Sequence, residues 1–524
     1  RDLFGELCAA ARQDGLVVLA RMDSNRATEG FYRQHPEWFA RQADGSPYRA
    51  GDRYVACIFS DYYEVYLTGI LREIVDRYAP DGFTDNSWSG LDRASICFCD
   101  NCRRAFEAAH GYDLPTHADW DSPIYRVWMR WNYDRRLAVW DLNNRATQEA
   151  GGPHCLWLGM NSGNIHHQAL RFRDHKAICE RAPILMLDHQ RRGEQGFQQN
   201  GDTGKLCHEL MGWDALMPES MSQYQSGTPT FRLSAKPEVE ARLWMLAGLA
   251  GGIHPWWHFI SAYHEDRRQY RTAVPVMQWV AANQEYLLNR QPVASVGVVW
   301  SQENVDYFGR DQGEERVMAP YYGVMQALIR ARIPYLPVHA DHIERAAGRL
   351  AVLVLPNLAA MSDAQIESVR RFVAQGGGLV ATGESSLYTG WGDRRADFGL
   401  ADVLGVHGSG EAIGNSGKPQ TSWETYASHT YLRLHPGVRG QVDGPLKGDE
   451  PVDAGPRHAA LAGFEETDIL GFGGKLAQVT ADAKTEVPLT FIPAFPIYPP
   501  EFSWMREPDS GLPALVLHEP DAGG

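Results

Sequence analysis

The chain has 524 residues, 44% of them hydrophobic and 22% charged, which is typical of a well-packed globular protein of two or three domains. The formal net charge of −15 argues against a phosphate-binding surface, because nucleic-acid binders need clustered Lys and Arg. No apolar run approaches the roughly 20 residues that cross a bilayer. The sequence therefore predicts neither nucleic acid nor a membrane as a partner.

Six short apolar runs end in polar residues and alternate with helical stretches. The runs cover residues 15–25, 81–88, 154–164, 183–190, 213–220 and 251–259. Between them, apolar residues recur at spacings of three and four, as in "YYEVYLTGILREIVDRYA". Buried parallel strands that alternate with helices predict an α/β fold, a (β/α)8 or TIM-type barrel. Since a complete barrel has eight strands, we expect that the first two βα units are missing from the N-terminus.

The pattern changes near residue 293, and we expect three regions. Residues 1–292 form the N-terminally incomplete barrel, residues 293–405 a doubly wound α/β domain, and residues 406–524 an irregular β-rich extension of that domain. In the second region Ser362 has the position of a helix N-cap. The layout resembles class I amidotransferase domains, but those use a nucleophilic Cys and none follows Cys207. A structural role is expected for this region.

Three closely spaced cysteines, Cys97, Cys99 and Cys102, form a C-x-C-x2-C cluster. Tetrahedral Zn2+ prefers four thiolate or imidazole ligands, so a fourth must come from elsewhere, and Cys57 is the candidate. The alternative is a set of buried thiols without a metal. Because this spacing suits a metal better than a disulfide framework, it favours a reducing compartment such as the cytoplasm. The chain starts without an initiator Met or a signal-peptide pattern, so we expect a fragment whose localisation cannot be read.

These motifs together resemble the family 42 glycoside hydrolases, the β-galactosidases. The resemblance covers Arg53 and Cys57, then "TDNSW", "CFCDNCRRAF" and the aromatic helix "YRVWMRWNYDRR". Later, "ALMPESMSQYQ" resembles the family's seventh strand, which ends in the nucleophilic Glu, and "RLWMLAGLAGGIHPWWHF" resembles the following helix and eighth strand. The second domain is similar to that family's trimerisation domain, which implies a homotrimer. "YAPDGFTDNSW" also resembles the fourth strand of α-L-fucosidases, whose strand-end Asp is the nucleophile.

The resemblance implies a retaining glycoside hydrolase that releases a terminal sugar. Galactosides are the first expected substrate class and fucosides the second. The reaction needs two carboxyl groups, one ionised and one protonated. Where the family carries its acid/base Glu this chain has Ser87, whose hydroxyl cannot protonate a leaving oxygen. Asp85 is the nearest carboxyl group, and strand alternation places positions 85 and 87 on one side. We expect Asp85 and Glu219 to be the catalytic pair, in either order of roles; a turn Asp and a loop Glu are the alternatives.

Polar and aromatic residues near the other strand ends are candidates for sugar contacts. Sugar hydroxyl groups need fixed polar partners, and their C–H faces stack on indole rings. The candidates are Arg53, Asn86, Asn161, Asp188, His189, Trp256, Trp257, His258 and Glu265. For the two tryptophans, a core position beneath the barrel mouth is the alternative.

Two further classes of protein stay open. Ser87 favours a catalytically impaired carbohydrate-binding or scaffold protein on a hydrolase barrel. A zinc hydrolase is the weaker alternative, because a site closed by four thiolates leaves no open position for water. We expect no cofactor for catalysis and Zn2+ only as a structural ion.

Overall fold

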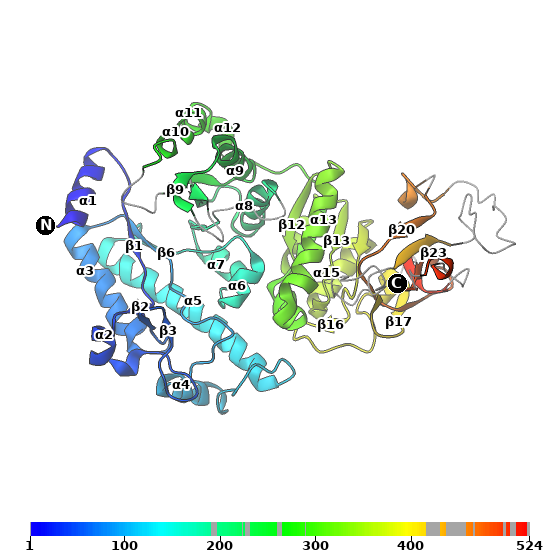
Figure 1. Ribbon diagram of the computed structural model, residues 1–524, viewed down its shortest axis with the longest axis horizontal. Helices are drawn as coiled ribbons and strands as arrows, with labels where there is room; N and C mark the ends of the chain where they lie inside the picture. Colours follow the sequence, from blue (N-terminus) through cyan, green and yellow to red (C-terminus); the bar gives the residue numbers. More distant parts are fainter. Residues whose placement is uncertain are drawn as a thin grey trace. The chain divides into compact units, whose positions relative to one another are not determined.

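The computed structural model describes most of the chain as two compact units, Arg1–His339 and Ala340–Gly524 (Figure 1). The described residues are 2–189, 196–222, 224–225, 231–258, 265–288, 290–414, 430–435, 457–464, 467–495, 499–503 and 510–520. The division falls at His339, inside the predicted second domain. The domain limits at residues 292 and 405 stay a prediction.

Among the described residues between Leu19 and His258, six parallel strand segments follow one another. They are β1 (Leu19–Met22), β5 (Gly82–Asp85), β6 (Leu156–Gly159), residues 184–187, β7 (Pro218–Ser222) and β10 (His254–His258). β5 lies between β1 and β6, and β7 pairs with β10. Parallel bridges from Leu187 to Asn161 and to Glu219 join the two groups. The predicted α/β fold with successive parallel strands is confirmed, whereas the two missing units stay a prediction.

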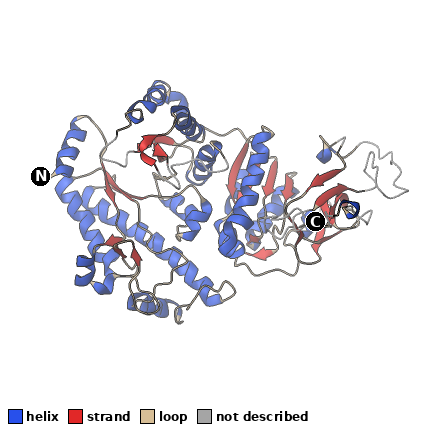
Figure 2. Cartoon of the chain, viewed as in Figure 1, coloured by secondary structure: helices blue, strands red, loops and turns tan. Residues whose placement is uncertain are grey.

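One helix precedes β1, and others occupy the connections between these strands (Figure 2). They are α1 (Leu3–Gln13), α3 (Thr68–Tyr78), α5 (Pro123–Gly151), α6 (Ile165–Leu170), α7 (His175–Arg181), α8 (Gln198–Met211) and α9 (Glu238–Ala250). α5 has a proline at its first position and ends before Gly152, which are favourable start and stop residues. Trp157 of β6 packs edge-on against Trp140 of α5, with ring centroids 5.3 Å apart. This contact shows which face of the strands the helices cover.

Between β1 and β5 the chain forms a small antiparallel sheet of order β2-β4-β3. Its elements and those around it are β2 (Arg26–Ala27), α2 (Glu29–Gln34), the 3-10 helix η1 (Pro36–Trp38), β3 (Arg49–Ala50), β4 (Arg53–Val55) and the π-helix η2 (Tyr62–Leu67). α4 (Asp100–His110) follows β5 and ends at Gly111, whose φ of 73° is in the left-handed region that favours glycine. This excursion carries Cys57 toward the loop before α4.

The first unit ends with elements that continue beyond β10. They are α10 (Gln269–Thr272), α11 (Val274–Ala282), α12 (Gln284–Leu287), β11 (Val296–Trp300), the helical turns η3 (Asn304–Gly309), η4 (Arg310–Gln312) and η5 (Glu314–Met318), α13 (Ala319–Arg330) and β12 (Tyr335–His339). β11 and β12 are parallel. A short antiparallel pair, β8 (Tyr224–Gln225) and β9 (Phe231–Ala235), follows β7. The buried Asp306 carboxylate of η3 accepts hydrogen bonds from Arg93 (2.6 Å) and Tyr133 (2.7 Å), which anchors this segment within the unit.

The second unit begins with parallel strands and continues with antiparallel ones. Its first part contains α14 (Ile343–Ala347), β13 (Val352–Leu355), β14 (Ala360–Met361), α15 (Asp363–Ala374), β15 (Gly378–Ala381), β16 (Tyr388–Thr389) and α16 (Ala401–Leu404). The predicted N-cap is confirmed: Ser362 and Gln365 form a reciprocal capping box at the start of α15. The later strands are β17 (Val406–Gly408), β18 (Ile413–Gly414), β19 (Tyr431–Leu434), β20 (Ile469–Gly471), β21 (Lys475–Leu476), β22 (Val479–Ala481), β23 (Glu486–Ile492) and β24 (Pro513–Leu517). A four-stranded antiparallel sheet has the order β20-β19-β23-β24.

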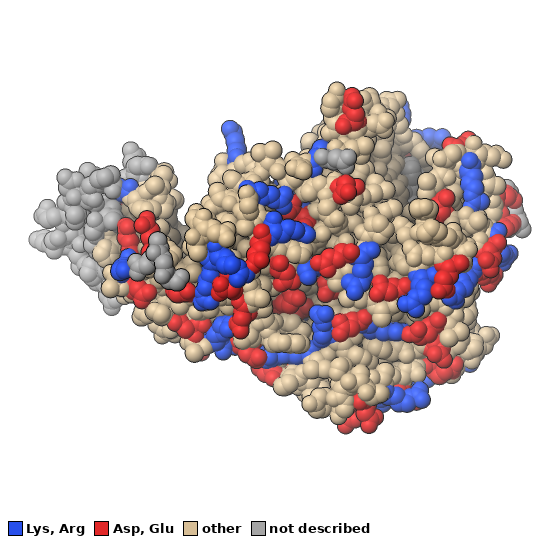
Figure 3. Space-filling model, turned by 180° about the vertical axis from the view of Figure 1, so that it is seen from behind, with Lys and Arg blue, Asp and Glu red and all other residues tan. Residues whose placement is uncertain are grey.

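The surface carries charges of both signs. Figure 3 shows basic and acidic side chains interspersed over the face that it displays. Among the described helices, none is both long enough and apolar enough to cross a bilayer.

Candidate active site

Asp85 is the last residue of β5 and is fully buried. Its Oδ1 accepts hydrogen bonds from the backbone N–H groups of Ser24 (3.3 Å) and Ser87 (3.2 Å), and its Oδ2 accepts one from the Ser24 hydroxyl. Burial raises the pKa of Asp85 to about 6, while these hydrogen bonds act in the opposite direction. The carboxyl group thus links the ends of β1 and β5.

The raised pKa of Asp85 predicts a pH-dependent contribution to stability. Because the folded pKa of about 6 exceeds the ordinary value of 3.8, the folded state binds more protons between about pH 4 and 6. The stability from this group is present below about pH 4 and is lost as the pH rises toward 6. A shift of about two pKa units corresponds to at most about 3 kcal/mol.

Asp85→Asn cannot ionise, so we expect the free energy of unfolding of this variant, relative to the parent, to rise by up to about 3 kcal/mol between about pH 4 and pH 7. Chemical denaturation of both proteins at both pH values measures this change. A difference that is independent of pH would contradict the assigned pKa.

Glu219 lies in β7 and is also fully buried. Nδ1 of His189 is 3.6 Å from its Oε1, and neither carboxyl oxygen has a hydrogen bond of normal length to any described residue. Burial raises the pKa of Glu219 well above its ordinary value. The charges of Cys207 and Asp188 act in the same direction, whereas the Asn200 side chain opposes the shift. Burial therefore favours the protonated form of the Glu219 carboxyl group.

The face of the parallel strands opposite to the helices carries an apolar cluster. Its members are Leu19, Leu156, Leu158, Met160, Ile184, Met186 and Trp256. In each strand these residues are two positions apart, as alternation requires. By the same alternation, Asn86 and Asp188 follow this inner face at the carboxyl ends of their strands.

The predicted catalytic pair lies on the other, helix-covered face. Asp85 is paired with Gly159, which shares its face with Trp157, and Glu219 is paired with Leu187. Both carboxyl groups therefore sit at strand ends as predicted, but beneath the helix layer and without solvent exposure. The sequence could not show this, because a shift of one residue at a strand end reverses the face.

Sequence reasoning missed Arg173, a buried arginine between α6 and α7. Its Nη1 donates to the Met160 carbonyl (2.7 Å) and its Nε to the Ser89 hydroxyl (3.2 Å). The guanidinium carbon lies 5.1 Å from the ring centroid of Trp88. These contacts hold the loop after β5 against the end of β6. A single Arg between helices carries no periodic signal in the sequence.

The buried guanidinium of Arg173 interacts with carboxylates from two strand ends. Burial lowers the pKa of Arg173 to about 9, and the carboxylates of Asp85 and Asp188 oppose this shift. Asp188 also raises the pKa of Glu219.

Other predicted substrate contacts are divided between exposed and buried positions. Arg53 is half exposed in β4, with Asp52 3.7 Å away, and Asn86 is exposed after β5. Asn161 is buried and has both ends occupied: its Nδ2 donates to Gly159 (2.7 Å) and its Oδ1 accepts from Gln168 (3.1 Å). These two hydrogen bonds give the Asn161 side chain a structural role.

Asp188 and His189 are half-buried beside Glu219. Nδ1 of His189 lies 3.3 Å from the Thr203 hydroxyl, and its ring packs edge-on against Trp244. These two residues directly follow the strand segment at residues 184–187, which pairs with β7.

Trp256 and Trp257, the two tryptophans predicted to stack on a sugar, point to opposite faces because side chains alternate along a strand. Trp256 belongs to the inner apolar cluster, and its ring stacks with that of His258 at 5.7 Å. Trp257 points to the other face, where its Nε1 donates to the Gln269 carbonyl (3.1 Å). Glu265 is exposed beyond β10. Only Trp256 retains the position of a candidate stacking residue on the inner face.

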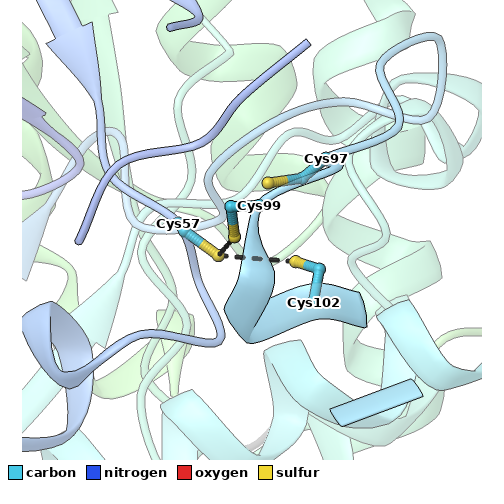
Figure 4. A group of neighbouring side chains, drawn as sticks. All are labelled: Cys57, Cys97, Cys99 and Cys102. Carbon is cyan, nitrogen blue, oxygen red and sulfur yellow. Dashed lines mark hydrogen bonds between the residues drawn. The ribbon is translucent and has the colours of Figure 1, made fainter. Parts of the chain in front are cut away.

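The four predicted metal ligands do come together. The sulfur atoms of Cys57, Cys97, Cys99 and Cys102 all lie within 4.8 Å of one another (Figure 4). Cys57 is 3.4 Å from both Cys99 and Cys102. A tetrahedral ion with Zn–S bonds of about 2.3 Å places sulfurs about 3.8 Å apart, so the arrangement fits Zn2+.

The four close thiols shift one another's pKa values in opposite directions. The hydrogen bond with Cys102, followed by those with Cys57 and Cys97, lowers the pKa of Cys99. Contact with Cys57 and the other thiols raises the pKa of Cys102 well above its ordinary value. Four thiolates so close together are stabilised by a divalent cation, and the closed ligand set suits a structural rather than a catalytic ion.

Comparison with known proteins identifies the fold. The family described as "Hypothetical glycosyl hydrolase 6" matches residues 1–87. No curated protein sequence matches. Among solved structures, a β-galactosidase from Bacillus circulans sp. alkalophilus is 15% identical with a TM-score of 0.72, covering 99% of this chain and 77% of that chain. Gan42B, a GH42 β-galactosidase from G. stearothermophilus, is 15% identical with a TM-score of 0.70, covering 94% and 74%.

An α-L-fucosidase is also similar in structure. Isoenzyme 2 from Paenibacillus thiaminolyticus is 16% identical with a TM-score of 0.60, covering 95% of this chain and 64% of that chain. These similarities define a GH42-like fold, as the sequence motifs predicted.

Proposed function

We propose that this protein is a glycoside hydrolase whose reaction centre lies at the carboxyl ends of its parallel strands. The main support is that two buried carboxyl groups lie at strand ends and differ in their electrostatic environment. Burial raises the pKa of Glu219 well above its ordinary value, which favours its protonated form, whereas hydrogen bonds from Ser24 and Ser87 limit the rise of the Asp85 pKa to about 6. Cleavage of a glycosidic bond needs one protonated and one ionised carboxyl group.

In this proposal Glu219 is the general acid and Asp85 the nucleophile. Glu219 gives its proton to the leaving glycosidic oxygen while an Asp85 oxygen bonds to the anomeric carbon and the bond to the leaving oxygen breaks. A water oxygen then bonds to the anomeric carbon, the bond from that carbon to Asp85 breaks, and the Glu219 carboxylate takes a proton from the water, so the configuration is retained. His189, 3.6 Å away, is placed to stabilise the Glu219 carboxylate between the two steps. Because both carboxyl groups are covered, their covering side chains must move aside before a sugar reaches them.

We expect a terminal galactoside as the first substrate class and a fucoside as the second. The support is fold similarity to proteins named β-galactosidases and to one named α-L-fucosidase. The assignment of the nucleophile to the Asp at the end of β5 agrees with the α-L-fucosidase-like alternative.

A carbohydrate-binding protein without turnover is the second candidate. Ser87 occupies the position of the family's acid, and its Oγ accepts a hydrogen bond from the Asn25 backbone (3.3 Å), which is a structural role. The burial of Asp85 and Glu219 beneath the helices favours the same candidate. In that case Asp188 and Trp256 would bind a sugar on the inner face without cleaving it.

A screen of aryl glycosides, with proton NMR of the released sugar, separates the two candidates. We expect hydrolysis of a galactoside or fucoside, with the first-formed anomer retaining the configuration of the substrate. Sugar binding by calorimetry without release of any aglycone would support the binding protein instead. An inverted product would overturn the assignment of Asp85 as nucleophile.

Assembly as a homotrimer and a structural zinc ion at the four cysteines are further proposals. Light scattering of the intact protein tests the first, and a mass near that of one chain would reject it.

A further inference from the structure

A second cluster of metal-ligating side chains lies apart from the four cysteines. His175 and Cys179 of α7 and Cys207 of α8 are each at most 2% exposed. One ligand atom from each, a ring nitrogen or a sulfur, lies within 4.8 Å of the others. None of the three belongs to the predicted catalytic pair or to the C-x-C-x2-C motif.

The helix geometry brings the three ligands to one point. His175 and Cys179 are four residues apart and share a face of α7, and α7 packs against α8. The Cys207 sulfur lies 3.4 Å from Nε2 of His175. In a tetrahedral zinc site, a sulfur at about 2.3 Å and a nitrogen at about 2.0–2.1 Å are about 3.5 Å apart. The observed separation fits that geometry.

We propose that His175, Cys179 and Cys207 form a second metal site for a thiophilic d10 cation, of which Zn2+ is the test case. Two thiolates and one imidazole select soft or borderline cations over Mg2+ or Ca2+, which prefer oxygen. The three protein ligands come from two neighbouring helices, so a bound cation would join α7 to α8.

Gln168 of α6 is the outer partner of this site. Its Oε1 accepts from the Ser162 backbone N–H (3.1 Å), so its Nε2 faces Nδ1 of His175 at 3.0 Å. The Gln168 amide thereby holds the His175 ring with its Nε2 toward Cys207.

The metal content of the purified full chain tests the proposal. Protein produced with zinc and then dialysed against metal-free buffer is measured by plasma mass spectrometry. We expect Cys207→Ser and Cys179→Ser each to hold one equivalent less zinc per chain than the parent. Cys155→Ser is the matched control, because Cys155 is also a buried cysteine (3% exposed) but lies outside both clusters. Its zinc content should equal that of the parent.

The zinc content of a single variant that fails to fold could not be compared with that of the parent. A second measurement therefore uses the Cys97→Ser, Cys102→Ser double variant. This variant removes two ligands of the four-cysteine cluster and keeps the second site. Co2+ added to it should give thiolate charge-transfer absorbance, which a further Cys179→Ser change abolishes. Unchanged zinc in both single variants, or no such absorbance in the double variant, would overturn the proposal.

Discussion

Glu219→Gln should lower kcat for a methyl glycoside by about 10³-fold, since general acid catalysis contributes roughly 10²–10⁴-fold. The amide keeps the shape of the buried side chain but has no proton to give to the leaving oxygen. With a nitrophenyl glycoside the loss should be smaller, because nitrophenolate leaves with little help from an acid. Steady-state kinetics on both substrates give the two losses, and binding by calorimetry should be retained.

Glu209→Gln is the matched control for this variant. Glu209 is a buried glutamate of α8, and its Oε1 accepts a hydrogen bond from Trp213 (2.8 Å), which an amide oxygen also accepts. Its kcat should stay near that of the parent. Equal losses in Glu219→Gln on both classes of leaving group would contradict the role of Glu219 as acid.

Cys99→Ser should lower the free energy of unfolding by at least about 5 kcal/mol if a structural zinc ion holds the four cysteines, because such ions contribute about 10–16 kcal/mol in small domains. The residues around the cluster include Trp128 and Tyr133 of α5, so the loss should spread to a long helix. The corresponding fall in Tm is at least about 10 °C. Thermal unfolding followed by circular dichroism measures it.

Two controls distinguish a lost ion from a lost thiol. Cys155→Ser removes one buried thiol whose neighbour is a backbone carbonyl, at 3.6 Å, and should change Tm much less. A strong chelator should lower the Tm of the parent by more than that of Cys99→Ser, which keeps only the second proposed site, at His175, Cys179 and Cys207. A parent protein that is insensitive to the chelator and contains no zinc would show that the four thiols are only a buried cluster.

The order of the parallel strands and the four-cysteine cluster could be predicted from the sequence because both depend on local patterns. Apolar runs ending in polar residues give strands with their carboxyl ends in common, and the C-x-C-x2-C spacing gives three ligands of one ion. Cys57 could be named only as a candidate for the fourth ligand, since the antiparallel segment that carries it has no such signal. The structure brings it to 3.4 Å from two of the other thiols.

The orientation of the strand-end side chains could not be predicted in the same way. Asp85 and Glu219 are the predicted catalytic pair, and the register places both on the helix-covered face, which the sequence did not indicate. Trp256 and Trp257 likewise separate, because neighbours in a strand point in opposite directions. Arg173 and the His175, Cys179 and Cys207 cluster depend on contacts between elements distant in sequence, which single-sequence patterns do not contain.

Trapping of a covalent intermediate tests most directly whether the strand-end carboxyl groups cleave a glycosidic bond. The intact protein is incubated with activated 2-deoxy-2-fluoro derivatives of galactose and fucose, digested with trypsin and analysed by mass spectrometry. One sugar is expected on the peptide of residues 78–93, attached to Asp85. A sugar attached to Asp188 on the inner face, or hydrolysis of the parent glycoside with no trapped adduct, would contradict it.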